Sequence, residues 1–259
     1  MKRYLMAIIV LWTSSYINAG TAPVQEPIDR EAIAKIRDEG LNRSQALETF
    51  THFTEVIGPR LTATPAYKNT AEWARDRLKE WGLENPRLEA WEFGRGWTLE
   101  KFTVEMVEPR YMPLIGYPEA WSPSTAGELV AAPIFLGDKT LDAIEQMRGK
   151  IKGSIVLSAE HYNMIARMIQ RGLPVKLRVN VQTRFLTDDK NGYNVIAELP
   201  GVDPAPRDEV VMIGGHLDSW HSATGATDNA DGAAVVMASF AYHASARKEK
   251  IPPAKSKSD

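Results

Sequence analysis

The stretch Val210–Gly232, VVMIGGHLDSWHSATGATDNADG, decides how the chain is interpreted. Its first four residues, Val210–Ile213, are apolar and are followed by two glycines, a pattern typical of a buried strand in a parallel sheet. A second apolar run, residues 233–240, follows Gly232 and predicts a helix. The stretch therefore predicts a strand, a glycine-containing loop and a helix, which is the repeating unit of an open α/β sheet.

Three side chains in this stretch suit a metal site. In extended backbone, residues two apart point to the same side, so His216 and Asp218 share a face. Zinc accepts neutral imidazole and carboxylate oxygen, which makes His216 and Asp228 candidate ligands. Asp218 is placed to hold the imidazole of His216 in one tautomer. The alternative is a hydrogen-bonded loop histidine and an ordinary helix N-cap at Asp228.

Composition narrows the chemistry. The chain has 259 residues, 44% hydrophobic and 25% charged, which is enough for one large or two modest domains with a core. A net charge of −2 gives no reason to expect nucleic acid or an anionic membrane as a partner. The chain contains no cysteine, so any metal must be held by histidine and carboxylate.

The N-terminus has the layout of a secretory signal peptide. Lys2 and Arg3 precede a short apolar segment, residues 5–12, and Ala19 offers a small-residue cleavage site. The apolar segment is well short of the roughly 20 residues that a membrane-spanning helix needs. We therefore expect residues 1–19 to be removed and the protein to be secreted or periplasmic, with no membrane span.

Apolar spacing and capping residues predict three helices before residue 83. The first runs from residue 29 to 39 and ends at Gly40, and the second starts at Asn42, where Asn42 and Gln45 resemble a capping box. Gly58 ends the second helix. The third starts at Thr64-Pro65 and ends at Gly82.

The remaining chain predicts strands and a separate inserted unit. Strand character is found in four segments of the main domain, residues 88–93, 98–107, 193–199 and 209–213. Residues 117–191 predict a small β-rich insert, with strands at 129–135 and 154–157 and a helix at 141–147. Residues 29–116 and 192–243 then make up the main domain. Residues 244–259, rich in lysine, proline and serine, predict a disordered tail.

The stretches GGHLDSW and GATDNADG together resemble the first metal-binding region of the M28 family of zinc exopeptidases, in its aminopeptidase and carboxypeptidase Q branch. Residues 58–67 and 91–97 are similar to the N-terminal region of the same branch. The resemblance implies an α/β fold with the mixed sheet of a phosphorylase/hydrolase-like zinc peptidase, here incomplete. It also implies that residues 117–191 are a protease-associated domain.

The resemblance also implies roles for individual residues. His216 would bind one zinc ion, Asp228 would bridge two, and Asp218 would orient the imidazole as part of the catalytic machinery. The family often has a strained peptide bond after the bridging aspartate, here Asp228–Asn229. The implied substrate is a peptide cleaved near one end, and a homodimer is left open.

The sequence departs from the family after Asp231. The family's site also needs a Glu-Glu pair, an aspartate and a histidine, but only Glu249, Asp259 and His243 follow. None of these fits, so we expect a truncated chain with half of the site, or else a non-catalytic binding protein on the same scaffold. Among the other histidines, His221 is a candidate for substrate contact, whereas His52 and His161 are expected to be structural.

Overall fold

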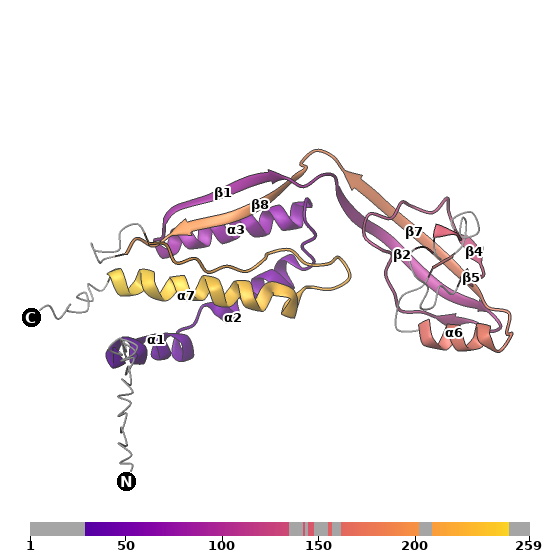
Figure 1. The fold of residues 1–259 in the computed structure, drawn as a ribbon, viewed down its shortest axis with the longest axis horizontal. Coiled ribbons are helices and arrows are strands. Elements are labelled where there is room, and N and C mark those ends of the chain that lie inside the picture. Colours follow the sequence, from indigo (N-terminus) through magenta and orange to yellow (C-terminus); the bar gives the residue numbers. More distant parts are fainter. Residues whose placement is uncertain are drawn as a thin grey trace, which may run out of the picture.

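The computed structural model describes residues 29–134, 142, 145–147, 155–156, 162–201 and 209–248, which form two lobes joined by a long β-ribbon (Figure 1). The predicted signal peptide, His161, residues 141, 143 and 144 of the predicted helix 141–147, and the end of the tail lie outside these residues. No helix in the described ranges is long and apolar enough to cross a membrane.

The helical lobe contains the first helices, one strand pair and the last helix. Its elements are α1 (Arg30–Asn42), α2 (Ala46–Thr51), η1 (His52–Ile57), α3 (Pro65–Trp81), β1 (Glu84–Glu92), β8 (Asn191–Glu198), η2 (Ala226–Ala230) and α7 (Asp231–Lys248). The β-rich lobe contains β2 (Gly96–Glu108), β3 (Met112–Pro113), β4 (Leu129–Ala131), β5 (Pro133–Ile134), β6 (Ile155–Val156), α6 (Tyr162–Gln170) and β7 (Lys176–Leu186).

Local signals place the boundaries of α3 correctly. The hydroxyl of Thr64 accepts a hydrogen bond from the backbone N–H of Tyr67, and Pro65 occupies the first turn, where its missing N–H costs nothing. Gly82 ends the helix in the left-handed conformation, with φ 92°. Gly58, with φ 80°, likewise ends η1 as expected.

Two predictions about α1 and α2 are wrong. Helix α1 continues through Gly40 to Asn42, and a helical glycine costs only about 1 kcal/mol relative to alanine. Asn42 is therefore the last residue of α1, and its amide donates to Asp38 at 2.6 Å instead of capping the next helix. The hydroxyl of Ser44 bonds to the N–H of Ala46 at the start of α2.

The long strands run as two antiparallel ribbons, and β5 and β6 form a separate parallel pair. β1 pairs with β8 in the helical lobe, and β2 pairs with β7 in the β-rich lobe, where the strand order is β3-β2-β7-β4 (Figure 1). The mixed α/β architecture is confirmed. β2 precedes residue 117 and β7 lies within 117–191, so this sheet crosses the predicted domain boundary, and the protease-associated assignment stays a prediction.

Each lobe has its own apolar core. In the helical lobe, α3 and α7 pack together with η1 through Phe53, Ala74, Leu78, Leu83, Ala230, Ala233 and Met237. In the β-rich lobe, α6 packs on β2 and β7 through Val104, Met106, Ile165, Val175, Leu177, Val179 and Val181. A third small cluster, Leu61, Trp97 and Ala120, lies between the lobes.

The predicted strand at residues 209–213 does not form in the described part of the chain. Val210, Val211 and Met212 are 88%, 93% and 90% exposed, and no strand pairing involves this segment. A strand needs neighbours to satisfy its backbone N–H and C=O groups, and the described strands put only β1 beside β8. The prediction of a buried strand was therefore wrong for the described residues.

Four consecutive exposed apolar residues, 210–213, lead us to expect self-association through this segment. We expect Val211→Lys to reduce light scattering and the fraction of oligomer in sedimentation velocity, because a lysine on an unpaired strand opposes pairing with another chain. Val56→Lys is the matched control, since Val56 is 68% exposed but lies in η1. An equal reduction in the control would mean that total exposed apolar area, rather than this segment, causes the association.

A polar cluster ties α3 to β8. Asp189 accepts hydrogen bonds from Lys68, at 2.8 Å, and from the Tyr193 hydroxyl, at 2.7 Å, and these two contacts lower the pKa of Asp189 to about 2. The Tyr67 hydroxyl donates to the backbone carbonyl of Tyr193 at 2.7 Å. The first turn of α3 is therefore tied to Tyr193 in β8 and to Asp189, which comes just before that strand.

Asp189→Asn should lower the free energy of unfolding by roughly 1 kcal/mol at pH 7, a value reduced from the full pKa shift because the carboxylate is partly exposed. The pKa of the folded state is lowered from 3.8, so the stabilisation is complete above about pH 4 and disappears as the pH falls through about 2. Urea unfolding at several pH values measures this difference. A difference that stays constant from pH 7 to pH 2 would contradict it.

Candidate metal centre

The structure brings the three predicted site residues together. The Nδ1 atom of His216 lies 3.0 Å from an oxygen of Asp218, and its Nε2 atom lies 2.9 Å from an oxygen of Asp228. All three side chains are partly open to solvent, with exposures of 52%, 46% and 76%. The imidazole therefore lies between two carboxylates, and one of them, Asp228, comes three residues before the first residue of α7.

Thr62 extends this arrangement by one further contact. Its hydroxyl donates to the second oxygen of Asp218 at 3.2 Å, and its side chain is buried. Asp218 thus receives a hydrogen bond on one oxygen and faces the His216 ring with the other. Such a carboxylate holds Nδ1 in its protonated form and leaves Nε2 free to donate its lone pair to a metal.

The donor types of His216 and Asp228 fit zinc, but two donors are fewer than a zinc site needs. Zinc takes three or four protein ligands from histidine, cysteine and carboxylate side chains. The part of the chain that the structure describes contains no group of three or more such residues able to hold a metal. His216 and Asp228 would therefore supply two of the ligands, and any further ligand lies outside the described residues.

In the loop before Asp228, the backbone at Gly225 packs closely against Ser219. Gly225 has φ 58°, and a Cβ atom at this position would collide with Ser219. Asp228 and Asn229 depart from helical geometry inside η2, and the peptide bond between them is cis. This is the bond that the resemblance singles out. The Asp228 carboxylate is thereby carried on irregular backbone immediately before the regular helix α7.

Arg60 holds the two ligand-bearing segments to each other. Its side chain is completely buried and donates to the carbonyls of Leu217 at 2.8 Å and Thr224 at 2.7 Å. It also reaches the carbonyls of Phe53, Gly58 and Gly225. Its backbone N–H donates to the Ser219 hydroxyl, and its carbonyl accepts from the Ser219 N–H. Burial lowers the pKa of Arg60.

Arg60, Thr62 and Ser219 were not assigned roles from the sequence. Arg60 and Thr62 lie in the stretch Gly58–Thr62, which supports the resemblance, but a single sequence does not show that an arginine is buried. A buried arginine is rare, and the sequence carries no pattern that marks this one. Only the folded chain reveals that this stretch lies under the metal-binding loop.

His221 connects the loop to the β-rich lobe. Its Nε2 atom lies 2.9 Å from the carbonyl of Pro118, and its ring packs edge-on against Trp97 at 4.8 Å. Burial lowers the pKa of His221 and favours the neutral ring. The structure therefore places His221 between the lobes with one nitrogen already engaged, while substrate contact by this residue stays a prediction.

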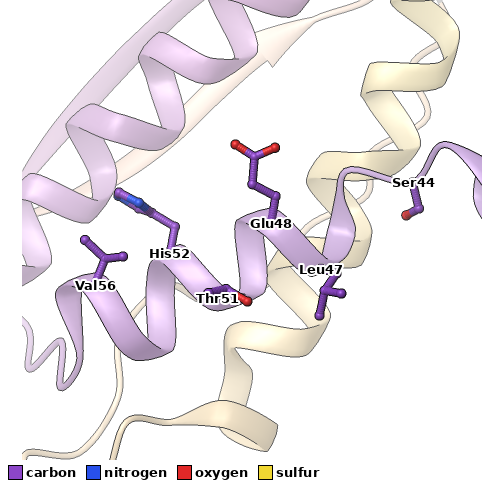
Figure 2. Close-up of a pocket in the computed structure, with 6 residues that line it drawn as sticks. All are labelled: Ser44, Leu47, Glu48, Thr51, His52 and Val56. Carbon is purple, nitrogen blue, oxygen red and sulfur yellow. The ribbon is translucent and has the colours of Figure 1, made fainter.

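His52 lies apart from these residues, as expected for a structural histidine. Its ring stacks on Trp73, with 4.1 Å between centroids, and burial lowers its pKa. A shallow hollow beside it is lined by residues of α2 and its flanks, and Figure 2 shows Glu48 and His52 on the same side of this helical segment. The hollow contains none of the predicted metal ligands.

The role of Asp218 predicts how zinc binding responds to its neighbours. Thr62→Val should weaken zinc binding severalfold and Asp218→Asn about 10-fold, because both loosen the hold on the His216 ring. Competition with a zinc-sensitive dye measures the affinities. Thr62→Ser keeps the hydroxyl and should bind zinc as the unaltered chain does; if it binds as weakly as Thr62→Val, the hydroxyl is not the cause.

Comparison with known proteins finds similarity to peptidases. The sequence profile described as peptidase family M28 matches residues 194–253, the part of the chain that contains His216, Asp218 and Asp228. Carboxypeptidase Q of Xenopus laevis is 35% identical over 77 residues, which cover 30% of this chain and 16% of that protein.

Two solved structures share the fold. A peptidase M28 precursor of Shewanella amazonensis superposes with a TM-score of 0.63 at 21% identity, covering 87% of this chain and 64% of that one. A zinc aminopeptidase of Bacillus subtilis gives a TM-score of 0.50 at 17% identity, covering 78% and 57%. The chain thus spans less than two thirds of each of these three proteins. Residues 194–253 are therefore similar to peptidase family M28, and the fold of the chain is similar to that of two M28-type enzymes.

Proposed function

We propose that this chain carries one half of the zinc centre of an exopeptidase that hydrolyses peptide bonds. The observation that carries the proposal is the position of His216, whose Nε2 faces the Asp228 carboxylate at 2.9 Å while Asp218 holds Nδ1 at 3.0 Å. A loop histidine with a merely structural role has no need of carboxylates on both ring nitrogens. The arrangement is the one in which a carboxylate tunes a metal-binding imidazole.

Each residue has a defined part in this proposal. His216 would bind one zinc ion through Nε2, and Asp228 would bridge that ion and a second one. Asp218 would keep the imidazole oriented and basic, with Thr62 holding Asp218 in place. Zinc, when bound, supplies Lewis acidity toward a peptide carbonyl and water. The general base and the remaining ligands are not among the described residues.

The substrate in this proposal is a peptide, attacked near one end. The relatives bear the names of both a carboxypeptidase and an aminopeptidase, so the end that is recognised is left open. The signal-peptide layout of residues 1–19 supports action outside the cytoplasm, and a homodimer remains an open prediction. We assign no substrate-binding residue.

A second function is favoured by one observation. The described residues supply two metal donors rather than three or four, so the same scaffold could serve as a non-catalytic binding protein. Retention of the Asp218–His216–Asp228 arrangement argues against this alternative, since a binding scaffold does not require it.

Zinc content and hydrolysis test the proposal on the purified chain. We expect weak zinc binding that His216→Ala and Asp228→Asn each abolish, and little or no chelator-sensitive hydrolysis of an aminoacyl anilide or a dipeptide. Catalytic groups of one site act as a unit, so removing several together removes most of the rate. Val56→Ala, in η1, is the control that should leave zinc binding unchanged.

Two results would change this conclusion. Zinc binding that survives both His216→Ala and Asp228→Asn would show that these residues are not the ligands. Two tightly bound zinc ions with rapid hydrolysis would overturn the view that the described donors form only half of a site.

A further inference from the structure

Arg60 is a fully buried cation whose hydrogen bonds, in the described part of the chain, go to backbone carbonyls. Arginine is seldom completely buried, because removing its charge from water costs several kcal/mol. Carbonyl oxygens from four separate places in the chain offset that cost here. These contacts hold several backbone segments of the chain in one fixed arrangement around the guanidinium.

The carbonyls that Arg60 binds flank both proposed ligands. Leu217 follows His216 directly, and its carbonyl accepts from Nε at 2.8 Å. Thr224 and Gly225 precede Asp228 in the same loop, and their carbonyls accept from the two terminal nitrogens at 2.7 and 3.3 Å. One planar guanidinium therefore bonds to the backbone one residue after His216 and to the backbone three and four residues before Asp228.

The His216 segment is held by the packing of Leu217 on the core of the helical lobe and by hydrogen bonds, rather than by strand pairing among the described residues. Residues 210–213 are exposed and unpaired among the described strands, so regular sheet bonding does not hold the chain before His216. Beyond the ligand, Ser219 exchanges two hydrogen bonds with the backbone of Arg60 at 2.9 and 3.1 Å. The side chain and backbone of Arg60 thus both act on the segment that carries His216.

We propose that Arg60 is a positioning residue that sets the separation between His216 and Asp228. The inference deepens the proposed function and rests on it. A lysine could not replace the arginine here, because a compact ammonium lacks the planar set of donors that reaches several carbonyls at once. Arg60 touches neither ligand side chain and acts only through the backbone that carries them.

The test follows the His216 imidazole by NMR of the full chain labelled with ¹⁵N-histidine. In the metal-free protein the ring signals report the contacts of His216 with Asp218 and Asp228. We expect Arg60→Lys to move these signals and, on titration with zinc sulfate, to weaken binding about 10-fold, as loss of an outer support does at other metal sites.

Two further variants separate positioning from general stability. Ser219→Ala removes only the hydroxyl that accepts from the Arg60 N–H, so it should shift the ring signals and zinc affinity in the same direction by a smaller amount. Asp189→Asn destabilises the helical lobe away from the loop and should leave the His216 signals in place. Should Arg60→Lys fail to fold, Ser219→Ala carries the test.

The outcomes are distinguishable. Wild-type signals that do not respond to zinc would overturn the proposed function, while the metal-free signals would still decide the role of Arg60. A folded Arg60→Lys protein, or Ser219→Ala when only that one folds, with unchanged ring signals and zinc affinity would overturn the positioning role. A matching change in Asp189→Asn would also overturn it, by showing that any loss of stability has the same effect.

Discussion

A single buried charge organises the region around the proposed metal ligands. The Arg60 guanidinium brings together the start of η1, the turn at Gly58, the exit from the 209–216 segment and the loop before η2. Desolvating an arginine costs several kcal/mol unless its donors are satisfied, so these carbonyls must stay where they are for the charge to be tolerated. The geometry of the surrounding backbone is therefore interdependent: moving one segment leaves a buried donor without its acceptor.

Two features of the helical lobe are incomplete in the same place. The metal-facing side chains offer two donors, and the apolar segment that leads to His216 has no strand beside it among the described residues. A ligand set and a sheet have the same physical requirement, because each needs side chains or backbone from several segments of a chain. The chain also spans less than two thirds of the relatives that it matches.

The β-rich lobe is joined to the site by more than the ribbon. Trp97, at the start of β2, is almost fully buried and lies edge-on against His221 in the metal-site loop. Gly96 passes so close to the backbone of Ala63 that a Cβ atom there would clash. The stretch that contains Arg60 and Thr62 is consequently packed between the loop and the first residues of the ribbon, which links the position of the lobe to the geometry of the site.

What could be read from the sequence was local. Thr64-Pro65 and Gly82 bound α3 because capping depends on neighbouring backbone groups, and the stretch around His216, Asp218 and Asp228 carried its own motif. At Gly40 the helix continued, because a glycine inside a helix costs only about 1 kcal/mol, and α1 buries no residue that could account for it by packing. Helix α6 was missed because its short apolar run was interpreted as part of a β-rich insert.

The sequence by itself determined the family motif, the chemical nature of the candidate ligands and both boundaries of α3, since these depend on residues close together in the chain. Only the tertiary structure decided that Arg60 is buried, that Thr62 supports Asp218 and that residues 210–213 lie exposed. Those properties depend on contacts between segments more than 150 positions apart, such as Arg60 and Leu217. A hydrophobic pattern states what a segment can bury, but only a neighbouring segment decides whether it does so.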